Sequence, residues 1–232
     1  MKKSEVISAI LQESIVEFAE HGFGGSSLRN IALKANTALS AINAYFGTKR
    51  SLYVAAEHAV WGEISLERNS LLRKVTALTP GKPTSVFDLV SCLAQPIVKR
   101  ALSRDIVATS QIRFIKDRLN EHASDGALIV VANNFVKPWI DELERSCQTL
   151  ARAHCVWAFS YCVGVIYSYQ LIDHRYDALL DISVDRTVED ITVEIATFCS
   201  GGIQSLIDLH STSGQGSMAT ARIHAGLKVG AI

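Results

Sequence analysis

Residues 18–53 read FAEHGFGGSSLRNIALKANTALSAINAYFGTKRSLY, where short apolar repeats alternate with glycine and serine. An apolar stripe at helical spacing leads into this segment and predicts a first helix over about residues 4–21; it consists of Ile7, Ile10, Leu11, Ile15 and Phe18. A glycine directly after such a stripe can adopt the left-handed conformation that ends a helix, and Gly22 stands in that position. We therefore expect the helix to end there and Phe23 to fold back onto its last turn.

Two further short helices are expected within the same segment. Ser26 or Ser27 can cap a second helix with a side-chain hydroxyl, and its inward positions are Leu28, Ile31, Ala32 and Ala35. The polar pair Asn36-Thr37 can break this helix and supply the cap of a third helix over about residues 38–45.

The third helix presents two different faces. Ile42 and Phe46 are expected in the core, whereas the outward positions are Leu39, Ser40, Asn43 and Ala44. Small and polar residues on an exposed helix allow the backbone to approach base edges, so the segment predicts a helix-turn-helix unit for the major groove. Thr48 is expected to cap a fourth helix that begins at Lys49 and continues to about residue 75.

The spacing of these residues resembles the N-terminal domain of the TetR family of transcriptional regulators. Positions typical of that family are occupied by Phe18, Ala19, Glu20, Gly22, Phe23, Ser26, Ser27, Leu28, Arg29, Ile31, Ala32, Tyr45, Phe46, Thr48 and Lys49. The resemblance implies an all-α protein, with a three-helix DNA-binding domain at residues 1–50 and a larger helical ligand-sensing and dimerisation domain at residues 51–210. Residues 211–232 are expected to form a flexible tail.

The resemblance also implies a ligand-responsive transcriptional regulator. We expect a repressor that binds a near-palindromic double-stranded DNA operator as a homodimer and is released by a small-molecule effector. A corepressor-dependent regulator or an activator is the alternative. The residues expected to contact DNA, at phosphates or at base edges, are Ser27, Arg29, Thr37, Leu39, Ser40, Asn43, Tyr45 and Lys49.

Two departures from the family pattern concern DNA contact. Asn36-Thr37-Ala38 stands where the family usually has Gly-Val-Ser, and Asn43 stands where it usually has tyrosine. An expected hydroxyl contact to phosphate is therefore missing at each place. We hypothesise that the amide of Asn43 instead pairs with N6 and N7 of an adenine.

Composition limits the possible functions. The 232 residues are 48% hydrophobic, and 23 basic and 23 acidic residues give a formal net charge of zero. Such a balance argues against a non-specific nucleic-acid coat and fits a protein whose DNA affinity comes from two heads on one duplex. The five cysteines are scattered, so we expect reduced thiols. The sequence shows no secretory pattern and no apolar run long enough to span a bilayer, so we expect a cytoplasmic protein without a membrane partner.

Helical patterns continue beyond residues 79–84, a linker rich in proline and glycine. They predict helices over about residues 84–101, 103–121, 125–151, 153–174 and 185–210. Residues 155–172 are apolar on all sides, so they need cover on all sides, and the same helix of a second subunit can provide it. We expect a four-helix dimer interface from residues 153–174 and 185–210, the second helix contributing a stripe of Val188, Ile191, Ile195, Phe198 and Ile203. The alternative is the innermost helix of a monomer.

A ligand pocket is expected within the body. Its proposed aromatic walls are Phe114, Phe135, Trp139, Trp157 and Tyr161, and Arg113 could meet an anionic ligand. The segment from Arg113 to Trp139 also resembles the sensor domain of one TetR branch. Equally, these aromatics can form an ordinary core, and Arg113 can pair with Asp117 one turn along a helix.

The sequence gives less support to two other classes of function. Cys155 and Cys162 suggest a thiol-redox-sensing repressor, although buried thiols are the simpler reading and the spacing is poor for zinc. An enzyme has little support, because the sequence contains no Gly-rich phosphate loop, nucleophile elbow or H-E-x-x-H motif. We therefore expect no enzymatic activity, metal or cofactor.

Overall fold

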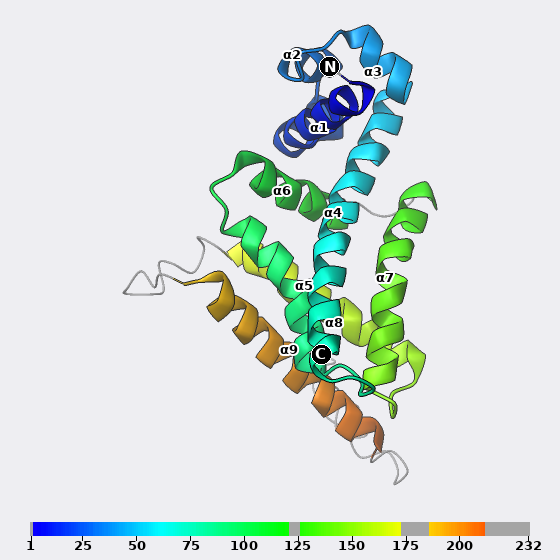
Figure 1. The fold of residues 1–232 in the computed structure, drawn as a ribbon, viewed down its shortest axis with the longest axis vertical. Coiled ribbons are helices and arrows are strands. Elements are labelled where there is room, and N and C mark those ends of the chain that lie inside the picture. The colour runs from blue at the N-terminus through cyan, green and yellow to red at the C-terminus, as the bar shows by residue number, and fades with distance from the viewer. Residues whose placement is uncertain (1, 121–125, 173–185, 212–232) are drawn as a thin grey trace, which may run out of the picture.

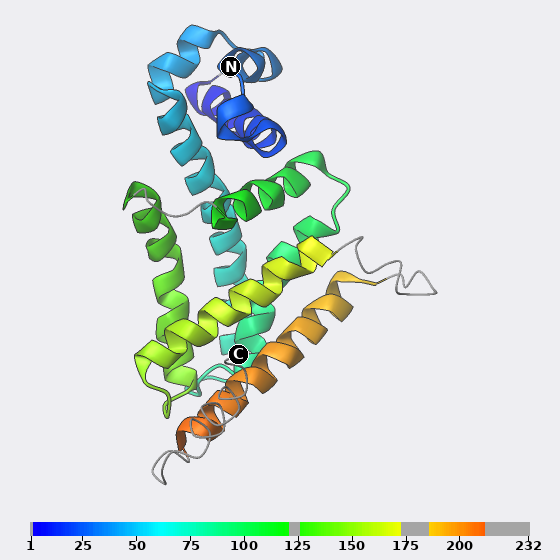
Figure 2. The same ribbon diagram turned by 180° about the vertical axis from the view of Figure 1, so that it is seen from behind.

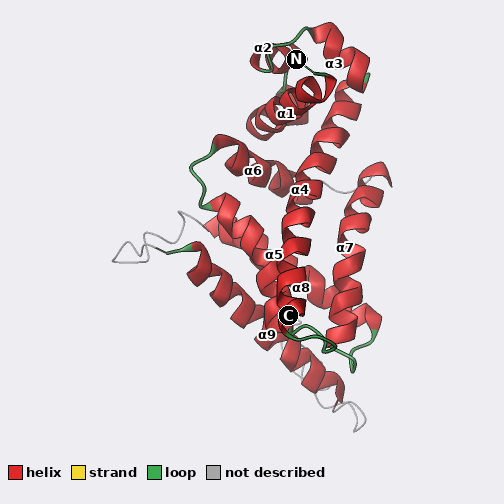
Figure 3. Ribbon diagram, viewed as in Figure 1, coloured by secondary structure: helices red, strands yellow, loops and turns green. Residues whose placement is uncertain are grey.

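A computed structural model describes residues 2–120, 126–172 and 186–211 of the chain. Throughout these ranges the regular secondary structure is helical (Figure 3), so the all-α prediction is confirmed. The helices are α1 (Lys3–Gly25), α2 (Leu28–Lys34), α3 (Leu39–Phe46), α4 (Lys49–Leu78), α5 (Val86–Ala101), α6 (Ile106–Asn120), α7 (Gly126–Ser146), α8 (Arg152–Ile172) and α9 (Val188–Ser211).

The chain forms a small head and a larger body that share one long helix. Helices α1, α2 and α3 pack together as the head, and α4 runs from the head down into the body (Figure 1). The hydroxyl of Thr48 accepts a hydrogen bond from the N–H of Ser51 at 3.0 Å, which confirms the predicted cap of α4. The expected domain boundary at residue 50 therefore falls in the first turn of a continuous helix, so a displacement of α4 in the body reaches the head directly.

Gly22 interrupts the first helix as its position in the sequence predicts. Its φ of 67° and ψ of 175° are non-helical, and a φ in this range is strained for any residue with a Cβ atom. After the break, Phe23 returns toward α1, and its ring centroid lies 6.4 Å from that of Phe18. Helical structure continues to Gly25 after the break, so α1 ends a few residues later than the predicted residue 21.

The body consists of the lower part of α4 and of α5 to α9; α5, α6 and α7 pack on α4, and α8 and α9 pack on α5. Helices α8 and α9 lie side by side and run in opposite directions on one face of the molecule (Figure 2), and α5 packs beneath α9. Each predicted body helix is present, with ends that differ by a few residues from the expected ones. The expected tail at residues 211–232 lies outside the described residues except for Ser211.

An aromatic cluster joins the head to the body. The ring of Phe114 on α6 lies 6.2 Å from Phe18 on α1 and 5.0 Å from Tyr53 on α4, measured between centroids. Phe114 is buried, with 1% of its surface exposed. Because α6 packs directly on α1, the head is held by α6 as well as by α4. As for the membrane, none of the helices in the ranges described here is long and apolar enough to cross one.

Candidate nucleic-acid interface and body interior

The turn between α2 and α3 depends on one residue with an unusual backbone conformation. The hydroxyl of Ser27 accepts a hydrogen bond from the N–H of Asn30 at 3.4 Å and caps α2, as predicted. Helix α3 is different, because its N-cap is Ala38 and no side chain caps it, so the prediction that Asn36-Thr37 supplies the cap is wrong. Instead Asn36 adopts a φ of 51°, a left-handed conformation that asparagine tolerates better than most residues, and thereby turns the chain.

The outward face of α3 is polar and open to solvent. Ser40, Asn43 and Tyr45 are exposed, and Arg29 on α2 is exposed beside them, whereas Thr37 is half-buried. Leu39 differs from the prediction, because its side chain is half-buried and packs against the core. This burial takes Leu39 away from the outward face and leaves its hydrophobic side chain as an anchor for the start of α3.

Lys49 has a structural role that the sequence did not indicate. Its Nζ donates a hydrogen bond to the carbonyl oxygen of Ser26 at 2.6 Å and lies 5.1 Å from the centroid of the Phe23 ring. Lys49 therefore holds the corner between α1 and α2 against the start of α4. A contact from Lys49 to a DNA phosphate remains a prediction, and it would have to form beside these internal contacts.

Glu17 is a buried carboxylate that the sequence reasoning missed. It is 1% exposed, and its Oε1 accepts hydrogen bonds from the backbone N–H of Ser27 at 3.0 Å and from the Asn30 amide at 3.4 Å. Its Oε2 accepts one from Nζ of Lys34 at 3.3 Å. Burial raises the pKa of Glu17, but these hydrogen bonds outweigh it and hold the pKa below its ordinary value. A sequence signal existed, since Glu17 directly precedes Phe18 on the apolar side of the first helix.

Residues 10–56, which span most of α1 and continue into the first turns of α4, match the family described as bacterial regulatory proteins, tetR family. The chain carries a TetR-type DNA-binding domain. The resemblance noted from the sequence is thereby confirmed. Among curated proteins, none matches the chain at a significant level.

Solved structures of transcriptional regulators share the fold at low sequence identity. A transcriptional regulator from Rhodococcus sp. Rha1 has a TM-score of 0.59 at 15% identity, and the match covers 88% of this chain and 97% of that one. The fatty acid degradation regulator FadR from Bacillus halodurans has a TM-score of 0.59 at 16% identity, covering 85% and 95%. AibR, solved in complex with isovaleryl coenzyme A and operator DNA, has a TM-score of 0.54 at 15% identity, covering 85% and 97%. The TetR-type head thus sits on a body whose fold is also that of such regulators.

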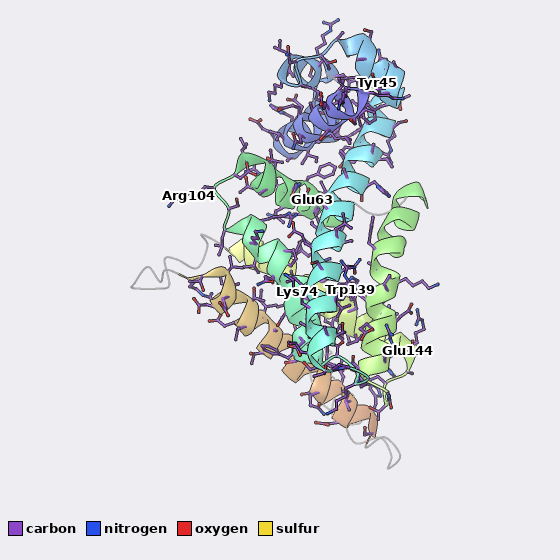
Figure 4. All side chains as sticks on the ribbon, viewed as in Figure 1. Tyr45, Glu63, Lys74, Arg104, Trp139 and Glu144 are labelled. Atoms are coloured by element: carbon purple, nitrogen blue, oxygen red, sulfur yellow. The ribbon has the colours of Figure 1, made fainter. Side chains whose placement is uncertain are left out.

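The six residues predicted to bind a ligand do not lie together in the body. Phe114 belongs to the aromatic cluster at the head, and Arg113 beside it is exposed. Asp117, its possible partner, has a side chain outside the described residues. Trp139 on α7 is buried and borders a small cavity with side chains of α5 and α8; Figure 4 labels it. The half-buried Phe135 lies on the same helix with its ring 5.5 Å from that of His58. Only these two stay inside the body as expected.

Trp157 and Tyr161 lie on the outer side of α8. They are 60% and 59% exposed, so they do not form the walls of an internal pocket in this structure. Their rings stack with centroids 6.4 Å apart. Helical periodicity explains the error, because it places residues on one face without showing what covers that face.

The predicted stripe on α9 divides between two environments. Ile191, Ile195 and Ile203 are buried and face their own body, where α5 packs on α9. Phe198 instead is 71% exposed. The five residues therefore do not form one outward stripe. Phe198 contributes to the open surface on α8 and α9, which also includes Tyr161. Val188, the fifth, is partly buried against the core.

A cleft of about 610 Å³ is lined by residues of α1, α4, α5 and α6 and of the loop between α5 and α6. Its floor contains Arg100, which is 5% exposed and forms ion pairs with Glu67 at 2.7 Å and Glu63 at 3.2 Å. Nε of Arg100 donates to the side-chain oxygen of Gln111 on α6 at 2.7 Å. Glu63 lies where α6 crosses α4 (Figure 4), so this network links α4, α5 and α6 just below the head. The hydrogen bond and charge of Arg100 hold the pKa of Glu67 below its ordinary value, against the effect of burial.

The cysteines are free and buried, and the structure does not pair Cys155 with Cys162. The thiol of Cys162 interacts with that of Cys199 on α9, whereas the thiol of Cys155 lies 4.0 Å from the carbonyl oxygen of Leu150. Burial raises the pKa of Cys147 to about 11 and also raises that of Cys155. Because the thiolate is the reactive form, these shifts make both thiols less reactive near neutral pH.

Proposed function

We propose that this protein is a ligand-responsive transcriptional repressor that binds a near-palindromic operator as a homodimer. The observation that carries the proposal is the combination of an exposed polar α3 on a TetR-type head with an exposed aromatic surface on α8 and α9. In this proposal residues 1–50 bind DNA, and residues 51–210 sense the ligand and dimerise. The match to AibR supports a fold in which an effector and operator DNA can both be bound.

The surface of α8 and α9 supports dimerisation. Trp157, Tyr161 and Phe198 are each more than half exposed, and an apolar groove of about 210 Å³ lies between the two helices. Monomeric proteins rarely expose contiguous apolar surface of this kind. A second copy of the same two helices would cover it around a two-fold axis, which would set the distance between the two heads. The exposed Gly164 on α8 would allow close approach between the subunits.

The exposed residues of α2 and α3 support contact with the major groove. Arg29, Ser40 and Asn43 are proposed to meet base edges, and Tyr45 the DNA backbone. Ser27, Thr37 and Lys49 are less accessible, so their proposed DNA contacts are secondary to their roles in the head; Leu39 is proposed only to anchor α3.

Helices α4 and α6 supply a physical route from the body to the head. A ligand bound in the body would favour a state in which α4, α6 or both helices are displaced, and this displacement would change the distance between the two heads. Movement of α6 would reach the head through the packing of Phe114 on Phe18 and Tyr53. A ligand shifts such an equilibrium only through its different affinity for the two states, and a coupling of about 1–3 kcal/mol changes operator affinity about 5- to 150-fold.

The direct test measures binding of the purified protein to DNA from upstream of its own gene. We expect a protected, near-palindromic site, a protein that is dimeric at micromolar concentration, and loss of binding in Arg29→Ala combined with Ser40→Ala. Equal affinity for a scrambled duplex, or a monomer in solution, would contradict the proposal. If the effector tightens operator binding, the protein is a corepressor-dependent regulator or an activator instead.

A further inference from the structure

The interior of the body contains a buried cation, Arg68, on the helix that carries the head. Arg68 lies on α4 and is 6% exposed. Its Nε donates a hydrogen bond to the carbonyl oxygen of Leu93 on α5 at 3.0 Å. This bond uses one edge of the guanidinium group.

Within the part of the chain that the structure describes, no carboxylate forms an ion pair with Arg68. The contrast with Arg100 is clear, because Arg100 is equally buried but has both Glu63 and Glu67 as partners. Burial lowers the pKa of Arg68, and the nearby charge of Arg100 lowers it further. Arg68 is therefore a buried cation without a paired carboxylate among the described residues.

A second polar group without a complete set of partners lies beside this cation. Tyr167 on α8 is 5% exposed, and its hydroxyl makes no hydrogen bond of full geometry among the described residues. It nevertheless interacts with the guanidinium of Arg68, which offsets part of the effect of burial on the pKa of both groups. Arg68 and Tyr167 thus bring together, from two different helices, a buried cation without a paired carboxylate and a buried hydroxyl without a hydrogen-bond partner among the described residues.

Buried polar groups of this kind are expensive to keep unless something satisfies them. A buried charge without a counter-ion destabilises the folded state, and proteins retain such groups mainly where they have a function. The free edge of a guanidinium matches the two oxygens of a carboxylate, and a phenol hydroxyl can donate a further hydrogen bond to one of them. Apolar side chains are also at hand, since Ile64 and Ile97, one turn from Arg68 and Leu93 on the same helices, are both fully buried.

We propose that Arg68 and Tyr167 bind the carboxylate of a small hydrophobic organic acid in the interior of the body. This inference rests on the proposed function and names the chemical class of the effector. It also assigns the anion-binding role to Arg68 in place of Arg113, which is exposed. The acid would carry its charge to Arg68 and leave its apolar part among the aliphatic side chains of α4 and α5.

The position of the two groups explains how such an acid would act on the head. Arg68 is on α4, which continues into the head, and Tyr167 is on α8, which carries the proposed dimer surface. The packing next to them is tight, because Leu93 and Trp139 border a cavity of only about 10 Å³. The acid would therefore require a slight separation of the helices, so it would bind a state different from the compact one and shift the population toward it.

The first experiment compares thermal unfolding of Arg68→Met and the matched control Arg100→Met without any ligand. We expect Arg68→Met to raise the melting temperature, because it removes a buried charge that lacks a counter-ion and keeps the volume of the side chain. Arg100→Met should lower it, because Glu67 and Glu63 lose their shared cation. If Arg68→Met lowers the melting temperature as Arg100→Met does, Arg68 is a structural residue and the proposal is overturned.

The second experiment uses benzoate, phenylacetate and octanoate as probes, with benzamide, phenylacetamide and octanamide as uncharged matches and inorganic phosphate as a different anion. At least one carboxylate should stabilise the wild-type protein more than its amide and more than phosphate. Arg68→Met should weaken that effect at least tenfold, and Tyr167→Phe should weaken it to a smaller extent. The proposal is overturned if no carboxylate stabilises the protein, if the amides stabilise it as much as the acids do, or if phosphate stabilises it as much as the acids do.

Operator binding in the same samples separates the two proposals. If a carboxylate binds through Arg68 but leaves operator affinity unchanged, the carboxylate site stands and the proposed ligand response fails. If an amide releases the operator equally from the wild-type protein and from Arg68→Met, the ligand response stands and the carboxylate site fails.

Discussion

The carboxylate of Glu17 on α1 and the ammonium of Lys34 on α2 lie 3.3 Å apart, with Glu17 buried and Lys34 partly exposed. Together with the hydrogen bonds from Ser27 and Asn30, this pair attaches the end of α2 and its N-terminus to the same carboxylate. The position of α2 relative to α1 therefore depends on one charged group. Since α2 supports α3, the placement of the DNA-binding face depends on that group as well.

Replacement of Glu17 by glutamine should destabilise the head. Glutamine keeps an oxygen acceptor but removes the charge, so we expect the free energy of unfolding to fall by about 1–3 kcal/mol, as measured by urea denaturation. Operator affinity should fall with it if α2 loses its position. A variant as stable as the wild type would show that the carboxylate contributes no net stability.

The stability contribution of Glu17 should depend on pH in a defined direction. Its pKa in the folded protein lies below its ordinary value of 4.5. The contribution is therefore fully present at pH values above 4.5 and is lost as the pH falls through the folded-state pKa. Wild type should lose more stability than Glu17→Gln over that acidic range. Parallel stability curves for the two proteins would contradict this cause.

Gly22 and Gly24 offer a matched pair of substitutions in the same turn. Gly22 has a φ of 67°, whereas the backbone of Gly24 is not left-handed, and a Cβ atom at either position would meet no other atom within 4 Å. Gly22→Ala should therefore lower the free energy of unfolding by about 1 kcal/mol, through backbone strain alone. Gly24→Ala should be neutral or slightly stabilising. Thermal unfolding of both variants measures the difference, and equal effects would rule out strain as the cause.

Charged residues on the outer side of α8 and α9 should separate the proposed dimer. Trp157→Glu and Phe198→Glu each place a charge where the two-fold interface is proposed, and each should raise the dimer dissociation constant at least about tenfold. Sedimentation or size-exclusion chromatography with light scattering gives the mass. Leu66→Glu is the control, because Leu66 is 71% exposed but lies on α4, outside this surface. If all three variants keep the wild-type mass, the interface lies elsewhere.

Asn43 should determine the preference at one base pair of the operator. Asn43→Ala removes the amide proposed to contact adenine and should reduce discrimination at that position by about 1–3 kcal/mol, with little change at other positions. A competition assay over a library of single-base operator variants measures the profile. Gln204→Ala on α9 is the control, since the Gln204 amide bonds to Asp208 in the body. An unchanged profile in Asn43→Ala would remove this hypothesis.

Local features of the head could be predicted from the sequence, because each depends on residues close together in the chain. The caps at Ser27 and Thr48 and the break at Gly22 follow from hydroxyl chemistry and from backbone sterics within one turn. The turn before α3 was less predictable. A polar residue at a helix boundary can either cap the helix with its side chain or turn the backbone. Asn36 turns the backbone, with a φ of 51°, and no side chain caps α3.

Side-chain environments that join distant elements could not be predicted in this way. Phe114 packs at the head, Trp157 lies on the outer surface and Arg113 is exposed, although the sequence predicted all three as pocket residues. Periodicity assigns a residue to a face of its own helix, but the element that covers that face is chosen by the packing of the whole chain.

By itself, the sequence determined that this protein is helical and that its first 50 or so residues form a TetR-type head, since spacing, caps and breaks act over a few residues. Only the tertiary structure decided which charges are buried and what they meet. Glu17 acquires Lys34 and Ser27 because α2 folds across α1, and Arg68 lies beside Tyr167 because α8 packs on α5 and α7, which also pack on α4. The physical reason is that desolvation and charge pairing depend on neighbours that are far away in the chain, and folding alone brings them together.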